Sequence, residues 1–469
     1  MTEVRRTDAI PYYCRALDFE RLLEEYPPAP LFYDRVYRLE RARLRAIQEE
    51  RFLEQVRRAW QIPFYRRRWE AAGLAPGDVR SLDDLGHLPT YTVYDIRDSI
   101  ERNPPFGDFM GITPHDGLPL VLQTSGGTTG MPRPHLYAPK EREVMALLRG
   151  RCLHMHGVRP GDLVQSTFSL GLSNGGFLMR EAIWKYTGAV PIMTGAGNST
   201  PTKRQIEIIR AWHTTVLTGF PAYLRHMALV ARDELGVDPR SLGIRLLSSH
   251  LGVEDRRTIE DLWSAPCYDS YGIHEAGLMA AECSHQRGMH IYEDAFILEV
   301  GDPETGRSVP VGERGNVFIT TLYKHGAPVI RYDVNDISSI MPDTCACGST
   351  LVRLEKIFGR ADNMVKLRGA NVFPEAIGAL LGGDARLTGE YVCVVQRVGE
   401  AGRDEMTVMV EIAAAGADRG SLQAELEGKV HDAVGVRIGV VLVERGGLDQ
   451  YTGLTQTSKI KRLVDRRQT

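Results

Sequence analysis

A run of glycine and hydroxyl residues, Thr124-Ser125-Gly126-Gly127-Thr128-Thr129-Gly130, is the segment of this sequence best suited to hold a phosphate. Glycines let the backbone approach an anion closely, and hydroxyl and main-chain N–H groups can wrap phosphate oxygens. No Gly-Lys-Ser/Thr closes the run, so it is not a Walker loop. The run predicts a phosphate-binding loop, and a plain surface turn is the alternative.

Two further segments each place a carboxylate after a strand-like run. Glu275 closes the segment Tyr271-Gly272-Ile273-His274-Glu275, and Asp336 closes the segment 331–336. Open α/β sheets bind ligands beyond the carboxyl ends of their strands. A carboxylate at that edge could hold Mg²⁺ beside phosphates, or accept hydrogen bonds from ribose hydroxyls. For Asp336 a simple loop cap is the alternative interpretation.

Cysteine and histidine residues form a third candidate group. Cys345 and Cys347 place two thiols two residues apart, and Cys283 lies about 60 residues upstream with His285 and His290 close by. Two pieces that each present soft ligands fit a tetrahedral structural Zn²⁺ site. The alternatives are free reduced cysteines or a redox pair of Cys345 with Cys347.

The elements that must position these residues follow from the pattern of apolar residues. Between residues 160 and 275, strand-like runs alternate with helical segments of ten or more residues, which predicts parallel strands joined by helical crossovers. The segment 35–60 has no Gly or Pro and predicts one long amphipathic helix. After residue 360, Tyr391–Val398 and Met406–Ile412 alternate like paired strands, and Ser421–Val434 is helical in pattern.

Composition excludes several classes of protein. The 469 residues include 57 Lys plus Arg against 60 Asp plus Glu. The net charge of −3 shows none of the excess of basic residues that is typical of nucleic-acid-binding proteins. No apolar run approaches the roughly 20 residues that span a bilayer. Seven cysteines are too few and too scattered for a secreted disulfide framework. We expect a cytoplasmic α/β protein that binds small molecules and neither nucleic acid nor membrane.

The sequence resembles the adenylate-forming enzymes, and most closely the phenylacetate–CoA ligase branch. The resemblance rests on the order and spacing of the segments described above, together with Ile62-Pro63-Phe64-Tyr65, the run 359–374 and the C-terminal run 457–465. The resemblance implies a large N-terminal body of parallel and mixed sheets with helices, residues 1–361, and a small mobile α+β domain, residues 362–469. It implies a ligase that uses ATP, Mg²⁺ and CoA. An aryl or arylacetic acid would attack the α-phosphate of ATP, and CoA would then displace AMP from the acyl-adenylate.

The resemblance also assigns roles residue by residue. Lys459 is the lysine of adenylation, with Lys461 as the competing candidate. Glu275, which helps to hold Mg²⁺, and His274 are the other residues assigned to catalysis. The hinge is Asp362. The segment with Gly288-Met289-His290 favours His290 over His285 as zinc ligand. The remaining nucleotide contacts are assigned to Thr124, Ser125, Gly126, Gly127, Thr128, Thr129, Gly130, His250, Tyr271, Gly272, Asp336 and Arg360. The aryl pocket is assigned to Phe168, Asn174, Gly175 and Phe220.

Several positions depart from the pattern of the branch. Met131 stands where the phosphate loop usually has Lys, and His274 replaces a small hydroxyl residue. The adenine segment appears here as Ser248-Ser249-His250-Leu251, and Asp333 and Asn335 replace the usual Arg and Gly. These departures leave open a second acceptor in place of CoA, either a carrier-protein thiol or an amine, and the activation of another oxyanion such as nitrite. A nucleotide-binding scaffold and a homodimer are further possibilities.

Overall fold

The computed structural model describes residues 10–125, 131–367, 370–382, 384–398, 403–413, 418–456 and 460–467. Over these residues the chain divides into two compact units, and the chain crosses between them several times. The first unit comprises Met1–Gly161, Leu170–Val190 and Ser270–Glu355. The second comprises Asp162–Ser169, Pro191–Asp269 and Lys356–Thr469.

Helices form the N-terminal part of the first unit. They are α1 (Tyr12–Arg15), α2 (Phe19–Glu25), α3 (Arg41–Ala59), α4 (Pro63–Ala71), α5 (Val93–Arg102), α6 (Pro139–Met155) and α7 (Asn174–Tyr186). The helix predicted over 35–60 is therefore shorter, and a five-residue π-helix, Tyr33–Tyr37, precedes it. The break has a tertiary cause, because the carbonyl of Tyr37 accepts hydrogen bonds from Ser349 Oγ at 2.9 Å and from Thr350 N at 3.1 Å.

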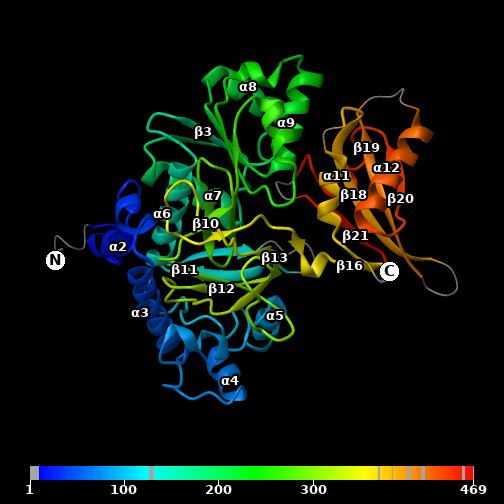
Figure 1. Ribbon diagram of the computed structural model, residues 1–469. Coiled ribbons are helices and arrows are strands. Elements are labelled where there is room, and N and C mark those ends of the chain that lie inside the picture. The colour runs from blue at the N-terminus through cyan, green and yellow to red at the C-terminus, as the bar shows by residue number, and fades with distance from the viewer. Residues whose placement is uncertain are drawn as a thin grey trace. The chain divides into compact units, whose positions relative to one another are not determined.

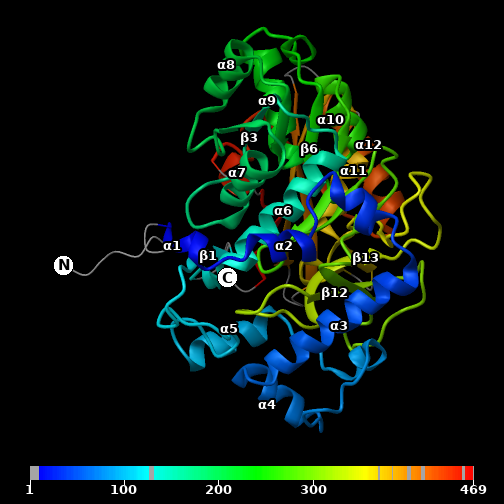
Figure 2. The ribbon, with the colours of Figure 1, turned by 90° about the vertical axis from the view of Figure 1, so that its left-hand side faces the viewer.

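Antiparallel strands complete the first unit. Strands β1 and β2 pair with each other, β8, β9, β10 and β14 form a second sheet, and β11, β12 and β13 pair in a third. Helix α3 lies beside this third sheet (Figure 2), where Gln48 Nε2 donates to the carbonyl of Phe296 at 3.3 Å. The strand bounds are β1 Val121–Ser125, β2 Arg133–Tyr137, β8 Ser270–Ile273, β9 Gly277–Glu282, β10 Met289–Ile291, β11 Phe296–Gly301, β12 Arg314–Thr321, β13 Tyr332–Ser339 and β14 Arg353–Leu354.

The second unit contains the parallel sheet that the sequence predicts. Its strand order is β4-β3-β5-β6-β7, and β3 with β5, β5 with β6, and β6 with β7 pair in parallel. A buried apolar cluster joins the helices to the strands, with Trp263 and Leu247 among its members. The elements are β3 (Leu163–Ser166), β4 (Val190–Met193), β5 (Val216–Gly219), β6 (Leu246–Ser249), β7 (Cys267–Tyr268), α8 (Thr202–Trp212), α9 (Pro221–Glu234) and α10 (Arg256–Trp263).

The C-terminal segment of this unit has a core of its own. Its sheet has the order β20-β19-β18-β21, and helices α11 and α12 lie beside it (Figure 1). Residues of these two helices share one apolar cluster with residues of the sheet. The paired strands and the helix predicted here are confirmed. The elements are β15 (Gly359–Arg360), β16 (Val365–Leu367), β17 (Ala370–Val372), α11 (Ile377–Leu381), β18 (Leu387–Val398), β19 (Arg403–Ile412), α12 (Arg419–Val434), β20 (Gly439–Val443), α13 (Asp449–Thr452) and β21 (Leu463–Asp465).

Parallel and antiparallel sheets with flanking helices confirm the predicted α/β class with an α+β C-terminal segment. Across the described ranges, no helix is both long enough and apolar enough to cross a membrane.

Candidate functional site

Strand β2 directs alternate side chains toward the turn formed by His274 and Glu275. Residues two apart on a strand share a face, so Arg133, His135 and Tyr137 lie on one side. Arg133 Nη2 donates to the Glu275 carboxylate at 3.1 Å, and Tyr137 Oη donates to the carbonyl of His274 at 2.7 Å. The turn is therefore held through both a side chain and the main chain.

Lys324 lies fully buried against the same turn. Its ammonium donates to the carbonyl of Glu275 at 2.7 Å and to His135 Nε2 at 2.8 Å. Burial lowers the pKa of Lys324 to about 8. Burial and the Lys324 cation lower the pKa of His135 well below its usual range. Sequence reasoning missed both residues, although the alternation of Arg133, His135 and Tyr137 along one short strand was a visible signal for His135.

The charge states of His274 and Glu275 follow from this packing. Burial is the main cause that lowers the pKa of His274 to about 4, against the attraction of Glu275. Burial alone would raise the pKa of Glu275, but His274 and Arg133 lower it on balance. Within the described ranges, His274 Nε2 has no hydrogen-bond partner. At neutral pH the turn therefore presents a neutral imidazole beside an ionised carboxylate.

Tyr271 and Asp336 come together from strands β8 and β13. Tyr271 Oη donates to Asp336 Oδ2 at 2.7 Å, and both side chains are buried. Gly272 follows at a register shift, where a Cβ would lie 2.5 Å from the carbonyl oxygen of Gly277. A side chain at residue 272 would push these two strands apart, so the close approach requires glycine. Asp333 is instead engaged locally, accepting from Asn316 Nδ2 at 3.0 Å and from Asn335 N at 2.8 Å.

Three rings gather at the carboxyl ends of neighbouring parallel strands in the second unit. Phe168, Phe220 and His250 follow β3, β5 and β6 by one or two residues. The ring centroids of Phe168 and Phe220 are 5.1 Å apart, and His250 lies 5.6 Å from Phe168 and 5.8 Å from Phe220. Ligands bind at this edge of open α/β sheets, so these mutually inclined rings lie where the ring of an aromatic ligand could pack.

The other two predicted pocket residues, Asn174 and Gly175, begin helix α7 in the first unit. Asn174 is buried and accepts a hydrogen bond from Arg142, which also pairs with Glu181 at 2.7 Å. A Cβ at Gly175 would meet nothing within 4 Å. The geometry thus gives Asn174 a clear structural role and leaves open space at Gly175.

The predicted phosphate loop and lysine fall largely outside the described residues, which exclude 126–130 and 457–459. Thr124 and Ser125 are the last residues of β1, and Ser125 pairs with Arg133 across the β1–β2 ladder. The strands that flank the predicted loop therefore form one antiparallel pair. The predicted hinge Asp362 pairs with Arg360 through two hydrogen bonds of 2.9 and 2.8 Å.

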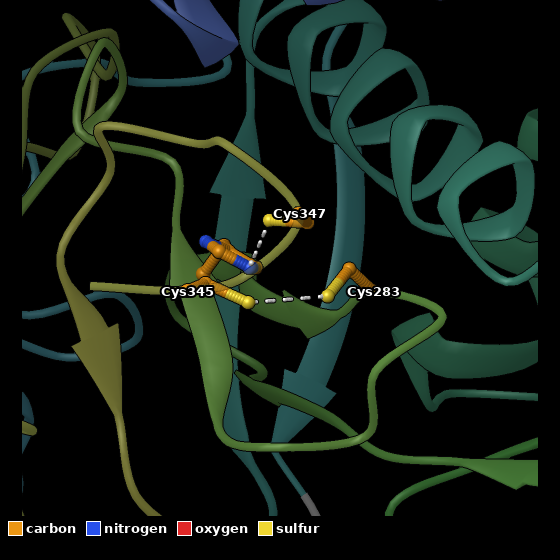
Figure 3. Close-up of side chains that lie close together, drawn as sticks. Cys283, Cys345 and Cys347 are labelled. Atoms are coloured by element: carbon orange, nitrogen blue, oxygen red, sulfur yellow. Dashed lines mark hydrogen bonds between the residues drawn. The ribbon is translucent and has the colours of Figure 1, made fainter. Parts of the chain in front are cut away.

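The cysteine and histidine residues predicted to bind zinc lie together in the first unit. The ligand atoms of Cys283, His290, Cys345 and Cys347 all lie within 4.8 Å of one another. Figure 3 shows the three thiols pointing toward one another, with 3.7 Å between the sulfurs of Cys283 and Cys345. Cys347 Sγ lies 3.4 Å from His290 Nε2. His285, the competing histidine, is exposed and stands outside this group.

Tyr37 is a neighbour of this cluster that the sequence did not reveal. Its hydroxyl donates to Cys347 Sγ at 3.0 Å, and its ring centroid lies 5.3 Å from that of His290. A hydroxyl that donates to a sulfur stabilises the thiolate form, which is the form that binds metals.

Comparisons with known proteins show what this chain is similar to. Residues 369–467 match the family model of the AMP-binding enzyme C-terminal domain. The chain is 32% identical to the phenylacetate–coenzyme A ligase of Thermus thermophilus, over 92% of this chain and 98% of that protein. It is 31% identical to the enzyme of the same name from Aromatoleum evansii, over 94% and 98%. The solved structure of 2-hydroxyisobutyryl-CoA ligase with a bound acyl-AMP matches with a TM-score of 0.83 and 30% identity, over 92% of each chain.

The fold and these likenesses define an adenylate-forming enzyme, an AMP-forming ligase of the acid–CoA type. Identity at this level over nearly the whole of both chains is decisive for the branch, and the chain belongs to the phenylacetate–CoA ligase family.

Proposed function

We propose that this protein activates an aromatic carboxylic acid with ATP as an acyl-adenylate and then transfers the acyl group to CoA. The relatives named above are acid–CoA ligases, which supports the two half-reactions. One observation carries the proposal. In the first unit, strand β8 brings the hydrogen-bonded pair Tyr271 and Asp336 close in sequence to a turn with a neutral His274 and an ionised Glu275.

In the first half-reaction a carboxylate oxygen of the acid attacks the α-phosphorus, and pyrophosphate leaves. Asp336 would accept the ribose hydroxyls, because Tyr271 occupies one of its oxygens and orients the carboxylate. Glu275, ionised and held by Arg133, offers the hard oxygen ligand that Mg²⁺ prefers. Bound there, Mg²⁺ would neutralise charge on the phosphates. Lys459 would offset the charge that develops at the α-phosphate.

In the second half-reaction the CoA thiolate attacks the acyl carbon and AMP leaves. Lys459 serves only the first step, so we propose that residues 362–469 form a mobile domain that turns about Asp362 against a body of residues 1–361. Lids and domains that assemble a site for one step and leave it for the next are common in enzymes.

The ring cluster supports an aromatic acid. Phe168, Phe220 and His250 stand where a ligand of the parallel sheet would lie, and their rings offer faces and edges to a second aromatic group. A relative with a small aliphatic acid also matches this fold well, so the choice of acid rests on this ring cluster.

A different acceptor is the second candidate, and His274 is the observation that favours it. An imidazole replaces a hydroxyl beside the expected acyl-phosphate, and Nε2 has no partner among the described residues. A neutral imidazole can accept a hydrogen bond from an incoming amine. Its lowered pKa favours this orienting role over that of a strong base.

A structural zinc ion fits the cluster of Cys283, His290, Cys345 and Cys347. The donor set is three thiols and one imidazole, the set that tetrahedral zinc sites use. Three thiolates within such a small sphere would repel one another without a cation between them. We propose that zinc ties the segment 283–290 to the segment 345–347.

The experiment that tests the function is pyrophosphate release across a panel of aryl acids, 2-hydroxyisobutyrate and nitrite, with and without CoA. Pyrophosphate release with an aryl acid and CoA-dependent thioester formation are the expected results. An amide or diazo product formed without CoA supports the second candidate instead. No pyrophosphate with any acid would contradict both.

A further inference from the structure

Two arginines and two glutamates form a buried ion cluster in the second unit that the proposed chemistry does not use. Arg225 donates to Glu254 at 3.0 Å and to Glu390 at 2.5 Å. Arg462 donates to Glu390 at 2.9 Å and to Glu254 at 3.4 Å. Each cation therefore contacts both anions, and the four charges form a closed ring of alternating sign.

The cluster joins distant segments of the chain. Arg225 lies on helix α9 and Glu254 just before α10, whereas Glu390 lies on β18 and Arg462 directly precedes β21. Two main-chain carbonyls complete it, because Arg225 also donates to Gly389 O at 3.0 Å and Arg462 to Tyr391 O at 2.8 Å. The ring of ions thus ties the segment 191–269 to the C-terminal segment.

These charges depend on one another. The side chains of Glu390, Arg462 and Arg225 are 5%, 7% and 8% exposed, so in the docked arrangement each charge is compensated by its partners and hardly by water. Removal of one partner from such a group leaves an uncompensated buried charge. Burial alone would raise the pKa of Glu390, but Arg462 and Arg225 lower it. The two arginines therefore keep the Glu390 carboxylate ionised although it is buried.

The same docking brings the neighbours of Lys459 against the parallel sheet's helices. Leu454 is 7% exposed within the apolar cluster of residues 206–267, and Ile460 packs against that cluster. At Gly197 a Cβ would lie 2.3 Å from the carbonyl oxygen of Thr455, so only glycine permits the approach. The chain on both sides of Lys459 is thus anchored in the arrangement that closes the ion ring.

We infer that Arg225, Glu254, Glu390 and Arg462 are positioning residues for adenylation: their ring holds the C-terminal segment where Lys459 is presented, and it must open before CoA attacks. The inference rests on the proposed role of Lys459 and on the proposed domain movement. The stability of the ring would then set how the enzyme divides its time between the arrangement for adenylation and the arrangement for thioester formation.

Two variants weaken the ring in different ways. Glu390→Gln keeps the shape and removes the charge, and Arg225→Lys keeps the charge but loses the fork that reaches both glutamates. Each should lower pyrophosphate exchange about tenfold or more, which is about 1.4 kcal/mol or more of the adenylation barrier. Thioester formation from supplied acyl-AMP should stay within about twofold or rise, since the variants weaken the docked arrangement that only adenylation uses.

The matched control is Arg386→Met. Arg386 pairs with Asp384 at 2.6 Å and with Glu425 at 2.8 Å, wholly inside the C-terminal segment and at its surface. Exposed pairs contribute little, so neither half-reaction should change. Thermal unfolding of each variant identifies one that does not fold, and the other variant then decides. An equal fall of both half-reactions in a folded ring variant overturns the inference.

A reversible cross-link tests the same point in one protein. An ideal Cβ at Gly382 lies 3.3 Å from Asp255 Cβ, close to the spacing that a disulfide needs. Oxidised Gly382→Cys/Asp255→Cys should keep adenylation, lose thioester formation, and regain it with a thiol reductant. Asp255→Cys alone, treated in the same way, controls for oxidation of native cysteines. Thioester formation that survives the cross-link overturns the inference, whereas absence of pyrophosphate release in the unmutated protein would instead contradict the proposed function.

Discussion

Replacement of Tyr271 by Phe should weaken ATP binding. The change removes one hydroxyl, whose hydrogen bond to Asp336 spans 2.7 Å between two buried side chains. A hydrogen bond to a charged group contributes about 1.5–3 kcal/mol, and part of that loss is recovered if water reaches the carboxylate. We therefore expect about 1–2 kcal/mol, or roughly 5- to 30-fold, in the KM for ATP, because Asp336 loses its orientation toward the ribose.

The assay is pyrophosphate exchange at varied ATP, with AMP binding measured by calorimetry. Tyr65→Phe is the matched control, because Tyr65 is equally buried and donates to the carbonyl of Pro328 at 2.7 Å. It should lower thermal stability by a comparable hydrogen bond, about 1 kcal/mol, and leave the KM for ATP unchanged. If Tyr271→Phe loses stability while its KM for ATP stays within twofold, the hydroxyl serves only packing and the assignment of Asp336 to the ribose fails.

Three further predictions concern the lysine, the metal and His274. Lys459→Ala should slow adenylation by about 2–4 kcal/mol, as loss of one transition-state donor does, and spare thioester formation from supplied acyl-AMP; a matching loss in Lys461→Ala alone would reassign the role. Purified protein should hold about one zinc per chain by elemental analysis, and Cys345→Ser should lower zinc content and thermal stability together. The control is Cys393→Ser, in the C-terminal core, which should keep its zinc. Because burial lowers the pKa of His274 to about 4, the imidazole is neutral throughout pH 6–7, and pH–rate profiles of the wild type and of His274→Thr should have the same shape there; an inflection near pH 6.5 that the variant loses would contradict this.

Local patterns in the chain were sufficient for much of this protein. The parallel strands of residues 163–268, the strand pair 387–412 and the helix after it follow from apolar periodicity, which records which face of each element is buried. The grouping of Cys283, His290, Cys345 and Cys347 was also predictable, because thiol and imidazole groups at short spacing have few other uses together. The break before α3 could not be predicted from the sequence, since it depends on hydrogen bonds to Tyr37 from residues more than 300 positions away.

The placement of charge was decided by the folded chain. Lys324 carries no sequence signal, yet it is buried between His135 and the Glu275 carbonyl and adds to the effect of burial in lowering the pKa of His135 and His274. Arg225 and Glu390 are 165 residues apart and meet only because β18 docks against α9. Backbone preferences act between near neighbours and can be read along a sequence. The pairing of buried charges depends on which surfaces exclude water together, and that is settled only when distant segments close on one another.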